Sequence, residues 1–510
     1  MSDHARVNGR LWLVLALTAA LGTSIFWIGH YIPFQDLVAQ AGVSAIRARI
    51  HASPVLSKNY MLGPEVGSYF LFRLIADTLG AHMNRLAVMR VFGTLAFLAA
   101  PTSLVAARLI LVGKWDARAG LVGACLGLGL MTLLGFANFQ IGEGTAIVAW
   151  AALVRANTAE TRGAVMKWLA LGAALAALTM LWHGFALALC GLAFAASFAV
   201  LPTRRWMTWL AWAPAGSIAI ASVIAERSAR MAADAGLGAH HGLGFQNIVD
   251  KISLLFSVTL MTRSGVDIVV GIGLWALVIA YAVRAYSARV WSGPGATERA
   301  LFAAWASMVV LFAALPHTIG WFGFVDGRVA PLIVAFAALS SLTWADANKR
   351  WLGYARTVLV ALGPVAIAAN DVRCSIAFQD EARGFDEVAE HIPSGARVLN
   401  LPLDPDSRIF AVHPFVHYDK LLLTTRDVVP SDVWFHAGTA VYATPENPAR
   451  RLPASYSESN LKVVEWDQYT SRDWDYALMR EKVGDAPPQP PPHLTLEAHA
   501  GGWWLFRFAS

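Results

Sequence analysis

Two charged residues in this sequence stand beside long apolar runs and have side chains suited to group transfer. Asp36 lies in the segment 33–37 (PFQDL), shortly after the first apolar run, and Arg328 begins the segment 328–331 (RVAP) at the start of a late run. A carboxylate can accept the proton of an attacking hydroxyl group. A guanidinium group stays charged and donates parallel hydrogen bonds to phosphate oxygens. We therefore expect Asp36 to be a general base and Arg328 to bind a phosphate.

Other polar residues are candidates because they share a loop with Asp36 or lie at junctions between apolar runs. They are His51, Lys58, Tyr60 and Glu65 in the polar segment 33–86, His183 and His317 at two junctions, and His240 in a glycine-rich segment. We expect His317 to assist Arg328 at the phosphate and the other six to contact substrate. The alternative is simple solvation for the loop residues and a structural hydrogen bond for the histidines.

The sequence offers no convincing metal site. His240 and His241 are adjacent, so their side chains diverge, and no cluster of acids accompanies them. Cys125 and Cys190 fall inside apolar runs and Cys374 stands alone, which argues against a disulfide framework or a zinc cluster. We expect the activity to need neither a metal ion nor a cofactor.

The composition is that of an integral membrane protein. Hydrophobic residues make up 56% of the 510 residues, charged residues only 15%, and the mean hydropathy is +0.50. Soluble domains carry about 25% charged residues, so a large part of this surface must face lipid. In lipid only helices and closed barrels satisfy the backbone, and the long Ala/Leu/Val runs have helical character.

Eleven apolar runs predict about eleven transmembrane helices. They lie at residues 11–32, 87–111, 119–137, 141–155, 166–183, 184–201, 206–225, 267–286, 299–316, 329–345 and 355–371. The first run is too long for the apolar core of a cleaved signal, so we expect it to remain as a helix. Between the first two runs, residues 69–79 form an amphipathic stretch that we expect to lie on the membrane surface.

The basic residues predict the orientation of these helices. With a cytoplasmic N-terminus, every inner loop contains Lys or Arg, whereas the short outer turns contain almost none. The long segments 33–86 and 227–266 then lie outside, as does everything after about Asp371. The formal charge of +6 is spread over these loops rather than gathered in one patch, which argues against nucleic-acid binding.

The composition changes after the last run. We expect residues 1–372 to form the transmembrane domain, with the outer loop 33–86, and residues 373–510 to form a small extracytoplasmic α/β domain. Within the latter, residues 385–391 predict a helix, and 397–403, 420–425, 440–444, 475–479 and 503–508 predict strands. The proline run 487–492 predicts an extended connector.

Asp36 and Arg328 also have simpler explanations in this layout. Asp36 could cap a helix or be a solvated aspartate at the lipid boundary. Arg328 could pair with Asp326, or extend its side chain from the helix end to water. A functional role is favoured for both because a charge at a lipid boundary is costly unless it is paired or used.

This layout resembles the GT-C superfamily of membrane glycosyltransferases, which take sugars from polyprenyl-phosphate carriers on the extracytoplasmic face. The resemblance covers roughly residues 10–370: an acid just after the first helix, a long first outer loop, many spans and an outer C-terminal domain. The segment RVAP is similar to the Arg-x-x-Pro found in parts of the superfamily, with Val329 where an aromatic residue often follows the arginine.

The resemblance implies an inverting transfer of a sugar from a polyprenyl-phosphate donor to a glycan, lipid or protein of the cell envelope. It also implies a bacterial inner-membrane location with a periplasmic C-terminal domain. A polysaccharide polymerase or O-antigen ligase remains an alternative, although its largest outer loop usually comes late in the sequence. A lipid or solute transporter is a second alternative, but the predicted spans are nearly free of charge and show no repeat.

Overall fold

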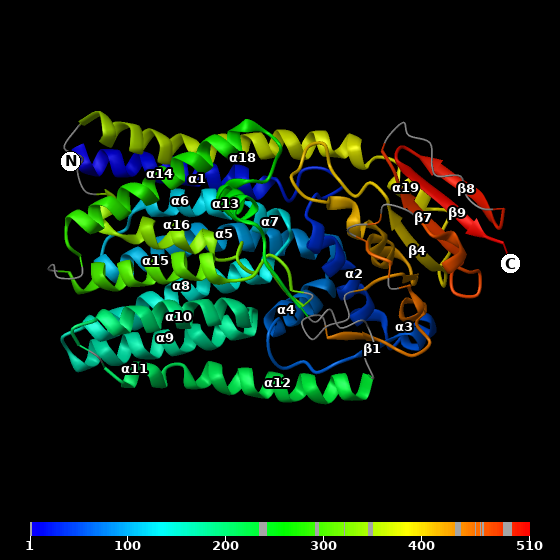
Figure 1. Ribbon diagram of the computed structural model, residues 1–510, viewed down its shortest axis with the longest axis horizontal. Helices are drawn as coiled ribbons and strands as arrows, with labels where there is room; N and C mark the ends of the chain where they lie inside the picture. Colours follow the sequence, from blue (N-terminus) through cyan, green and yellow to red (C-terminus); the bar gives the residue numbers. More distant parts are fainter. Residues whose placement is uncertain are drawn as a thin grey trace.

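The chain is a helical polytopic membrane protein with a small sheet domain at its C-terminal end. The computed structural model describes all residues except 1–2, 204, 234–241, 291–294, 321, 345–349, 434–439, 454, 459–460, 462–463, 483–491 and 510. In Figure 1 the long helices lie side by side in a bundle, with the N-terminus at the end away from the sheet. The segment that carries α2, α3 and α4 lies between the bundle and the sheet.

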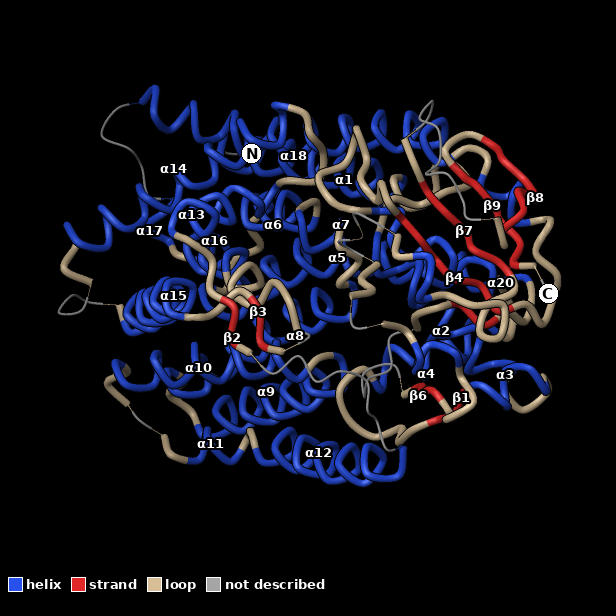
Figure 2. The backbone as a smooth tube through the Cα atoms, turned by 45° about the vertical axis from the view of Figure 1, so that its right-hand side comes forward, coloured by secondary structure: helices blue, strands red, loops and turns tan. Residues whose placement is uncertain are grey.

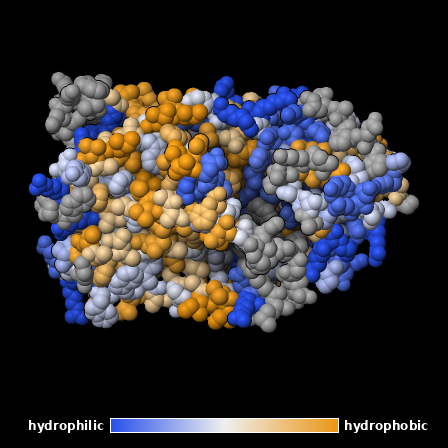
Figure 3. All heavy atoms as spheres, viewed as in Figure 1, coloured by the Kyte–Doolittle hydropathy of each residue, from blue (hydrophilic) through white to orange (hydrophobic). Residues whose placement is uncertain are grey.

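Each of the eleven predicted apolar runs contains a helix, which confirms this part of the prediction. The helices are α1 Asp3–Ser24, α5 Arg85–Val112, α6 Ala117–Gly127, α7 Leu130–Leu133, α8 Ala137–Thr158, α9 Arg162–Trp182, α10 Gly184–Val200, α11 Met207–Leu210, α12 Ala213–Ala233, α14 Gly265–Ser287, α15 Ala296–Ala314, α16 Ala330–Leu339, α17 Ser341–Trp344 and α18 Arg350–Ala382. Among the described residues, six helical stretches are long and apolar enough to cross a membrane, and four shorter apolar helices accompany them. Figure 3 shows apolar surface over the middle of the bundle on the face in view, with hydrophilic surface on either side of it.

Two segments between the long apolar helices carry further short elements. The first contains α2 Gln35–Arg49, α3 Pro54–Asn59, β1 Tyr60–Leu62 and α4 Phe70–Gly80, and the second contains β2 Leu243–Gly244, α13 Ile248–Phe256 and the 3-10 helix η1 Ser257–Thr259. The predicted amphipathic stretch 69–79 is therefore helical, as α4. A further short element, β3 Thr318–Ile319, pairs with β2.

The C-terminal region is built on a five-stranded sheet of order β5-β4-β7-β9-β8. Its elements are α19 Phe385–Ala389, β4 Arg397–Pro402, η2 Pro414–Leu421, α20 Leu422–Thr425, β5 Val429–Pro430, β6 Val441–Ala443, η3 Pro448–Arg451, η4 Trp466–Gln468, β7 Tyr476–Arg480, β8 Leu494–Ala500 and β9 Trp503–Phe508. Helix α18 continues to Ala382, so the expected domain boundary at residue 372 falls inside a helix. The predicted proline connector lies mostly outside the described residues.

Four of the five predicted strands are confirmed, and one prediction is wrong. Residues 420–425 are helical, not extended, because Leu422 and Leu423 are buried in a turn of α20 that packs against α2. A run of three leucines lacks the alternation that separates a strand from a helix. The sheet also contains β5 and β8, which the sequence did not predict.

The segment that carries α2, α3 and α4 is joined to the C-terminal region by backbone pairing. Strand β1 pairs antiparallel with β6, with Tyr60 opposite Ala443, and Figure 2 shows the two strands side by side. Helix α2 packs against η2 so closely that a Cβ atom at Gly42 would lie 2.9 Å from the carbonyl oxygen of Lys420. The helix that carries Asp36 is therefore held from both the bundle and the C-terminal region.

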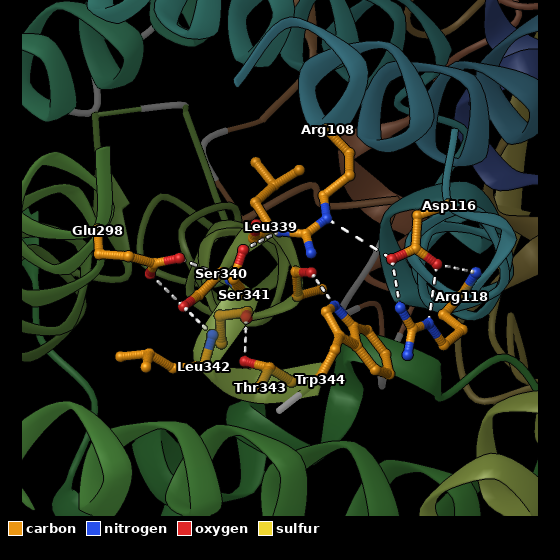
Figure 4. A network of polar contacts seen from close by, with 12 residues as sticks. Arg108, Asp116, Arg118, Glu298, Leu339, Ser340, Ser341, Leu342, Thr343 and Trp344 are labelled. Atoms are coloured by element: carbon orange, nitrogen blue, oxygen red, sulfur yellow. Dashed lines mark hydrogen bonds and ion pairs between the residues drawn. The ribbon is translucent and has the colours of Figure 1, made fainter. Parts of the chain in front are cut away.

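The far end of α16 is anchored by a polar network (Figure 4). Ten residues rise about 15 Å, which is half of a bilayer core, so this helix ends within the bundle. Arg108 donates to the carbonyl oxygen of Leu339, and Glu298 accepts from the backbone N–H of Ser341 at 2.8 Å. Asp116 lies 3.6 Å from Arg108 and so completes the network. The C-terminal end of α16 therefore has hydrogen-bond partners, and these contacts fix the position of the helix along its axis.

Candidate functional site

Asp36 lies in the first turn of α2 and is almost completely buried, with 8% of its surface exposed. Its backbone N–H donates to the carbonyl oxygen of Leu134 at 3.0 Å. Gly135 follows with a φ of +78°, and a Cβ atom there would lie 2.9 Å from the nitrogen of Asp36. The turn before α8 thus fixes the start of α2, and the alternative of an N-cap does not apply because Phe34 occupies that position.

Arg328 lies in the turn before α16 and is 4% exposed. Three aromatic rings surround its guanidinium carbon, at 3.9 Å (Phe322), 4.3 Å (Phe136) and 5.3 Å (Phe139) from the ring centroids. Within the part of the chain that the structure describes, its Nε and Nη1 atoms have no hydrogen-bond partner. Arg328 therefore presents unused donors in a dry, aromatic setting.

The alternative partner of Arg328 is engaged elsewhere. Asp326 pairs with Nδ1 of His317 at 2.9 Å and with Nζ of Lys251 at 3.5 Å. These contacts fix the loop that ends in Arg328. They also hold His317 against Asp326, which lies two residues before Arg328 in the sequence. The ring of His317 packs against Phe324, with 4.8 Å between centroids.

Asp36 and Arg328 influence each other electrostatically without forming a close ion pair. Burial raises the pKa of Asp36 well above its usual range, and the charge of Arg328 opposes this shift. Burial lowers the pKa of Arg328 to about 10, while the charges of Tyr69 and Asp36 act in the other direction. A buried base and a buried cation that interact in this way can act on two ends of one substrate bond.

Tyr69 belongs to the same site, although the sequence did not single it out. It precedes α4 in the left-handed conformation, with a φ of +69°, and its hydroxyl lies 3.3 Å from Nε2 of His183. Burial raises the pKa of Tyr69, while the charge of Arg328 lowers it and that of Asp36 raises it further. A left-handed φ is uncommon for a residue other than glycine and is often found at functional sites.

His183 is brought to this site and also has a structural role. Its Nδ1 accepts from the backbone N–H of Phe185 at 3.2 Å, which caps α10. Its ring lies 5.2 Å from Phe139 and 6.3 Å from Phe322, two of the rings around Arg328.

Four other candidates lie away from Asp36. His51 is exposed beyond the end of α2, about 20 Å along the helix from Asp36, and Lys58 is exposed on α3. Tyr60 is buried in β1 against the C-terminal region. Glu65 is exposed and pairs with two arginines, Arg47 of α2 at 3.0 Å and Arg73 of α4 at 3.3 Å. His240 lies outside the described residues.

Two cavities inside the helical bundle do not include the candidate pair. Both are small, and both are lined by Glu143 of α8. Neither Asp36 nor Arg328 lines either of them. Among the described residues, no group of three or more His, Cys, Asp and Glu side chains is arranged to hold a metal ion.

Comparison with known proteins identifies the fold. No family model matches the chain, and no curated protein matches it in sequence. Among solved structures, ArnT from Cupriavidus metallidurans bound to undecaprenyl phosphate matches with a TM-score of 0.59 and 11% identity over 98% of both chains. The arabinofuranosyltransferase AftD from Mycobacteria matches with a TM-score of 0.53 and 15% identity, over 99% of this chain and 40% of AftD. An apo oligosaccharyltransferase from Archaeoglobus fulgidus matches with a TM-score of 0.50 and 11% identity, over 92% and 69% of the two chains.

These three proteins are membrane glycosyltransferases of the GT-C superfamily. The present chain is a multi-pass membrane protein with the GT-C fold, as its sequence suggested.

Proposed function

We propose that this protein is a membrane glycosyltransferase that moves a sugar from a polyprenyl-phosphate donor to an extracytoplasmic acceptor, which is a glycan, a lipid or a protein. The observation that carries the proposal is the pair of Asp36 and Arg328, which are roughly 300 residues apart in the sequence but are both buried and close enough to influence each other's pKa. The match to a structure of ArnT bound to undecaprenyl phosphate supports a donor of this class.

The chemistry is a single displacement with inversion at the anomeric carbon. Asp36 accepts the proton as the acceptor oxygen bonds to that carbon. The bond from the carbon to the phosphate oxygen breaks, and its electron pair leaves with the polyprenyl phosphate. Arg328 stabilises the charge that develops on the phosphate through its free N–H groups. The raised pKa of Asp36 makes it a stronger base than an exposed aspartate.

The other candidate residues have supporting roles in this proposal. His317 acts on the donor phosphate through the loop that it shares with Arg328, and His183 contacts substrate together with Tyr69. His51, Lys58, Tyr60, Glu65 and His240 are proposed only as contacts to substrate.

The proposed setting is the inner membrane of a bacterium, with the N-terminus in the cytoplasm and residues 373–510 in the periplasm. The proposal rests on the basic inner loops of the sequence and on the extracytoplasmic chemistry of lipid-linked sugars.

The test is the turnover of a lipid-linked sugar by purified Asp36→Asn protein. An amide cannot accept the acceptor's proton, so we expect turnover to fall about 10²-fold or more while donor binding stays near the wild-type value. Asp36→Glu should retain little activity, because one methylene displaces the carboxylate by roughly 1 Å.

Asp380→Asn is the matched control, because Asp380 is exposed and pairs only with Arg383 among the described residues. Thermal unfolding of all three variants separates lost chemistry from lost folding. Transfer of sugar by Asp36→Asn at the wild-type rate would remove Asp36 from the mechanism and contradict the proposal.

A further inference from the structure

We propose that Phe322 is a positioning residue of the donor site: its ring fixes the guanidinium group of Arg328 and keeps it free to bind a phosphate. The inference rests on the proposed function, and it makes the outer hairpin (residues 317–320 and 322–328) part of the donor site.

The hairpin delivers the ring of Phe322 to Arg328 by its backbone pairing. Ile319 and Phe322 exchange hydrogen bonds of 2.9 and 3.0 Å, and the N–H of His317 donates to the carbonyl oxygen of Gly244 at 2.8 Å. The ring centroid of Phe322 then lies 3.9 Å from the guanidinium carbon of Arg328, closer than either of the other two rings.

The same ring seats the hairpin on the helical bundle. Phe322 meets Phe185 of α10 edge to face, with 5.5 Å between centroids, and lies 6.3 Å from His183. A shift of the hairpin would therefore move the ring and the guanidinium group together.

Aromatic neighbours suit this role better than an acid would. A carboxylate beside Arg328 would neutralise its charge and occupy the N–H groups that a phosphate needs. A ring attracts the cation through its π-face and takes no conventional hydrogen bond. The acid in the same loop, Asp326, is held by His317 and Lys251, and Nε and Nη1 of Arg328 have no partner among the described residues.

The experiment compares three variants of the full-length protein in detergent: Phe322→Leu, Phe322→Tyr and Phe198→Leu. Leucine keeps the apolar bulk and removes the ring, and tyrosine restores the ring. Phe198 is the control because its ring packs against Phe194 and Trp209, away from Arg328. Binding is measured with undecaprenyl phosphate as the probe, and kcat and KM with a lipid-linked sugar.

We expect Phe322→Leu to weaken binding of undecaprenyl phosphate about 10-fold and to raise KM for the donor by a similar factor. Phe322→Tyr should stay within about 3-fold of the wild type, and so should Phe198→Leu. If Phe322→Leu does not fold, Phe136→Leu removes the ring at 4.3 Å and carries the same expectation.

A double-mutant cycle with Arg328→Gln separates positioning from general packing. If Phe322 acts through Arg328, then Phe322→Leu should weaken binding little further once the guanidinium group is gone. An equal loss in both backgrounds, or unchanged binding in Phe322→Leu, would overturn the inference. Ring-dependent binding of undecaprenyl phosphate by a protein that transfers no sugar would instead contradict the proposed function and leave the inference intact.

Discussion

Arg328 is a buried cation whose nearest neighbours are aromatic rings, and Asp36 is a buried acid whose opposing charge is Arg328. Each residue pays a desolvation cost that the fold does not compensate with a close ion pair. Buried charged groups of this kind are concentrated at functional sites, because a substrate can supply the missing partner. The two side chains are therefore best understood together.

The pH dependence of activity should report this pairing. Activity falls as the pH drops through the pKa of Asp36, because a protonated base cannot accept the acceptor's proton. Burial raises that pKa, so we expect the acidic limb of kcat/KM to lie above the usual range of an aspartate. In Arg328→Gln the opposing positive charge is lost, the pKa of Asp36 rises further, and the limb should move to higher pH.

The measurement is the pH profile of kcat/KM for the wild type and for Arg328→Gln. Phe324→Leu is the control, since it changes the same loop and leaves the charge in place. A limb that stays at the same pH in Arg328→Gln would show that Asp36 is not the group that titrates.

Sequence reasoning found the two charged residues of the site but not its aromatic part. Asp36 and Arg328 stand out because charge is rare next to apolar runs. Phe322 and Phe136 do not stand out among 25 phenylalanines, since an apolar ring beside a membrane needs no special explanation. Tyr69 is marked only by its left-handed backbone, which no sequence pattern in its neighbourhood indicates.

At the scale of elements, the turn that joins α7 to α8 sets the position of α2. Gly135 combines a φ of +78° with a close approach to the nitrogens of Asp36 and Leu37. An alanine at this position would be destabilised by the left-handed backbone conformation. Its Cβ atom would also push α2 away from the turn. Gly113 has a similar φ of +73° at the end of α5, but a Cβ atom there would meet nothing within 4 Å.

We therefore expect Gly135→Ala to lower turnover about 10-fold or more through displacement of Asp36. Gly113→Ala should cost about 1 kcal/mol of stability from its backbone and leave turnover near the wild-type value. Turnover of a lipid-linked sugar and thermal unfolding check both variants. Equal turnover in the two variants would mean that the close contact at Gly135 does not position Asp36.

Helix positions were predictable because apolar length is a strong signal, whereas helix ends and pairings were not. The run 329–345 is one apolar stretch in the sequence, yet α16 ends at Leu339 because Arg108 and Glu298 bind its terminus. The pairing of β1 with β6 joins segments with only three residues each, and nothing in their composition selects the partner. Both features depend on contacts between distant parts of the chain.

At the scale of the whole molecule, a buried charge cluster lies where the C-terminal region meets α2. Lys420 pairs with Glu458, and His417 lies 3.1 Å from the other oxygen of Glu458. Burial alone would raise the pKa of Glu458, but Lys420 and His417 offset this and lower it to about 2. For Asp432, burial and the charge of Glu458 raise the pKa to about 6.

This raised pKa predicts how stability depends on pH. The unfolded chain has an aspartate pKa of about 3.9, so between pH 4 and 6 the folded state binds more protons at Asp432. Raising the pH through this window therefore removes stability, by at most about 3 kcal/mol. Asparagine at position 432 does not titrate, so Asp432→Asn does not lose this stability as the pH rises. The stability of the variant relative to the wild type should therefore increase from pH 4.5 to pH 7.5. Thermal unfolding at both pH values tests this, and a difference that does not change with pH would contradict the assigned shift.

The pairing of β1 with β6 has a consequence for how the protein is made. Residues 60–62 leave the ribosome early, whereas their partners 441–443 are synthesised roughly 380 residues later, which takes about 20 to 80 s at 5–20 residues per second. During that interval α2 also lacks η2, the element that packs against it. Asp36 and Arg328 would both be translated before the helix that carries Asp36 has its final support. The described fold of the site is thus completed by residues translated after Arg328, whereas the three rings around Arg328 all precede it in the chain.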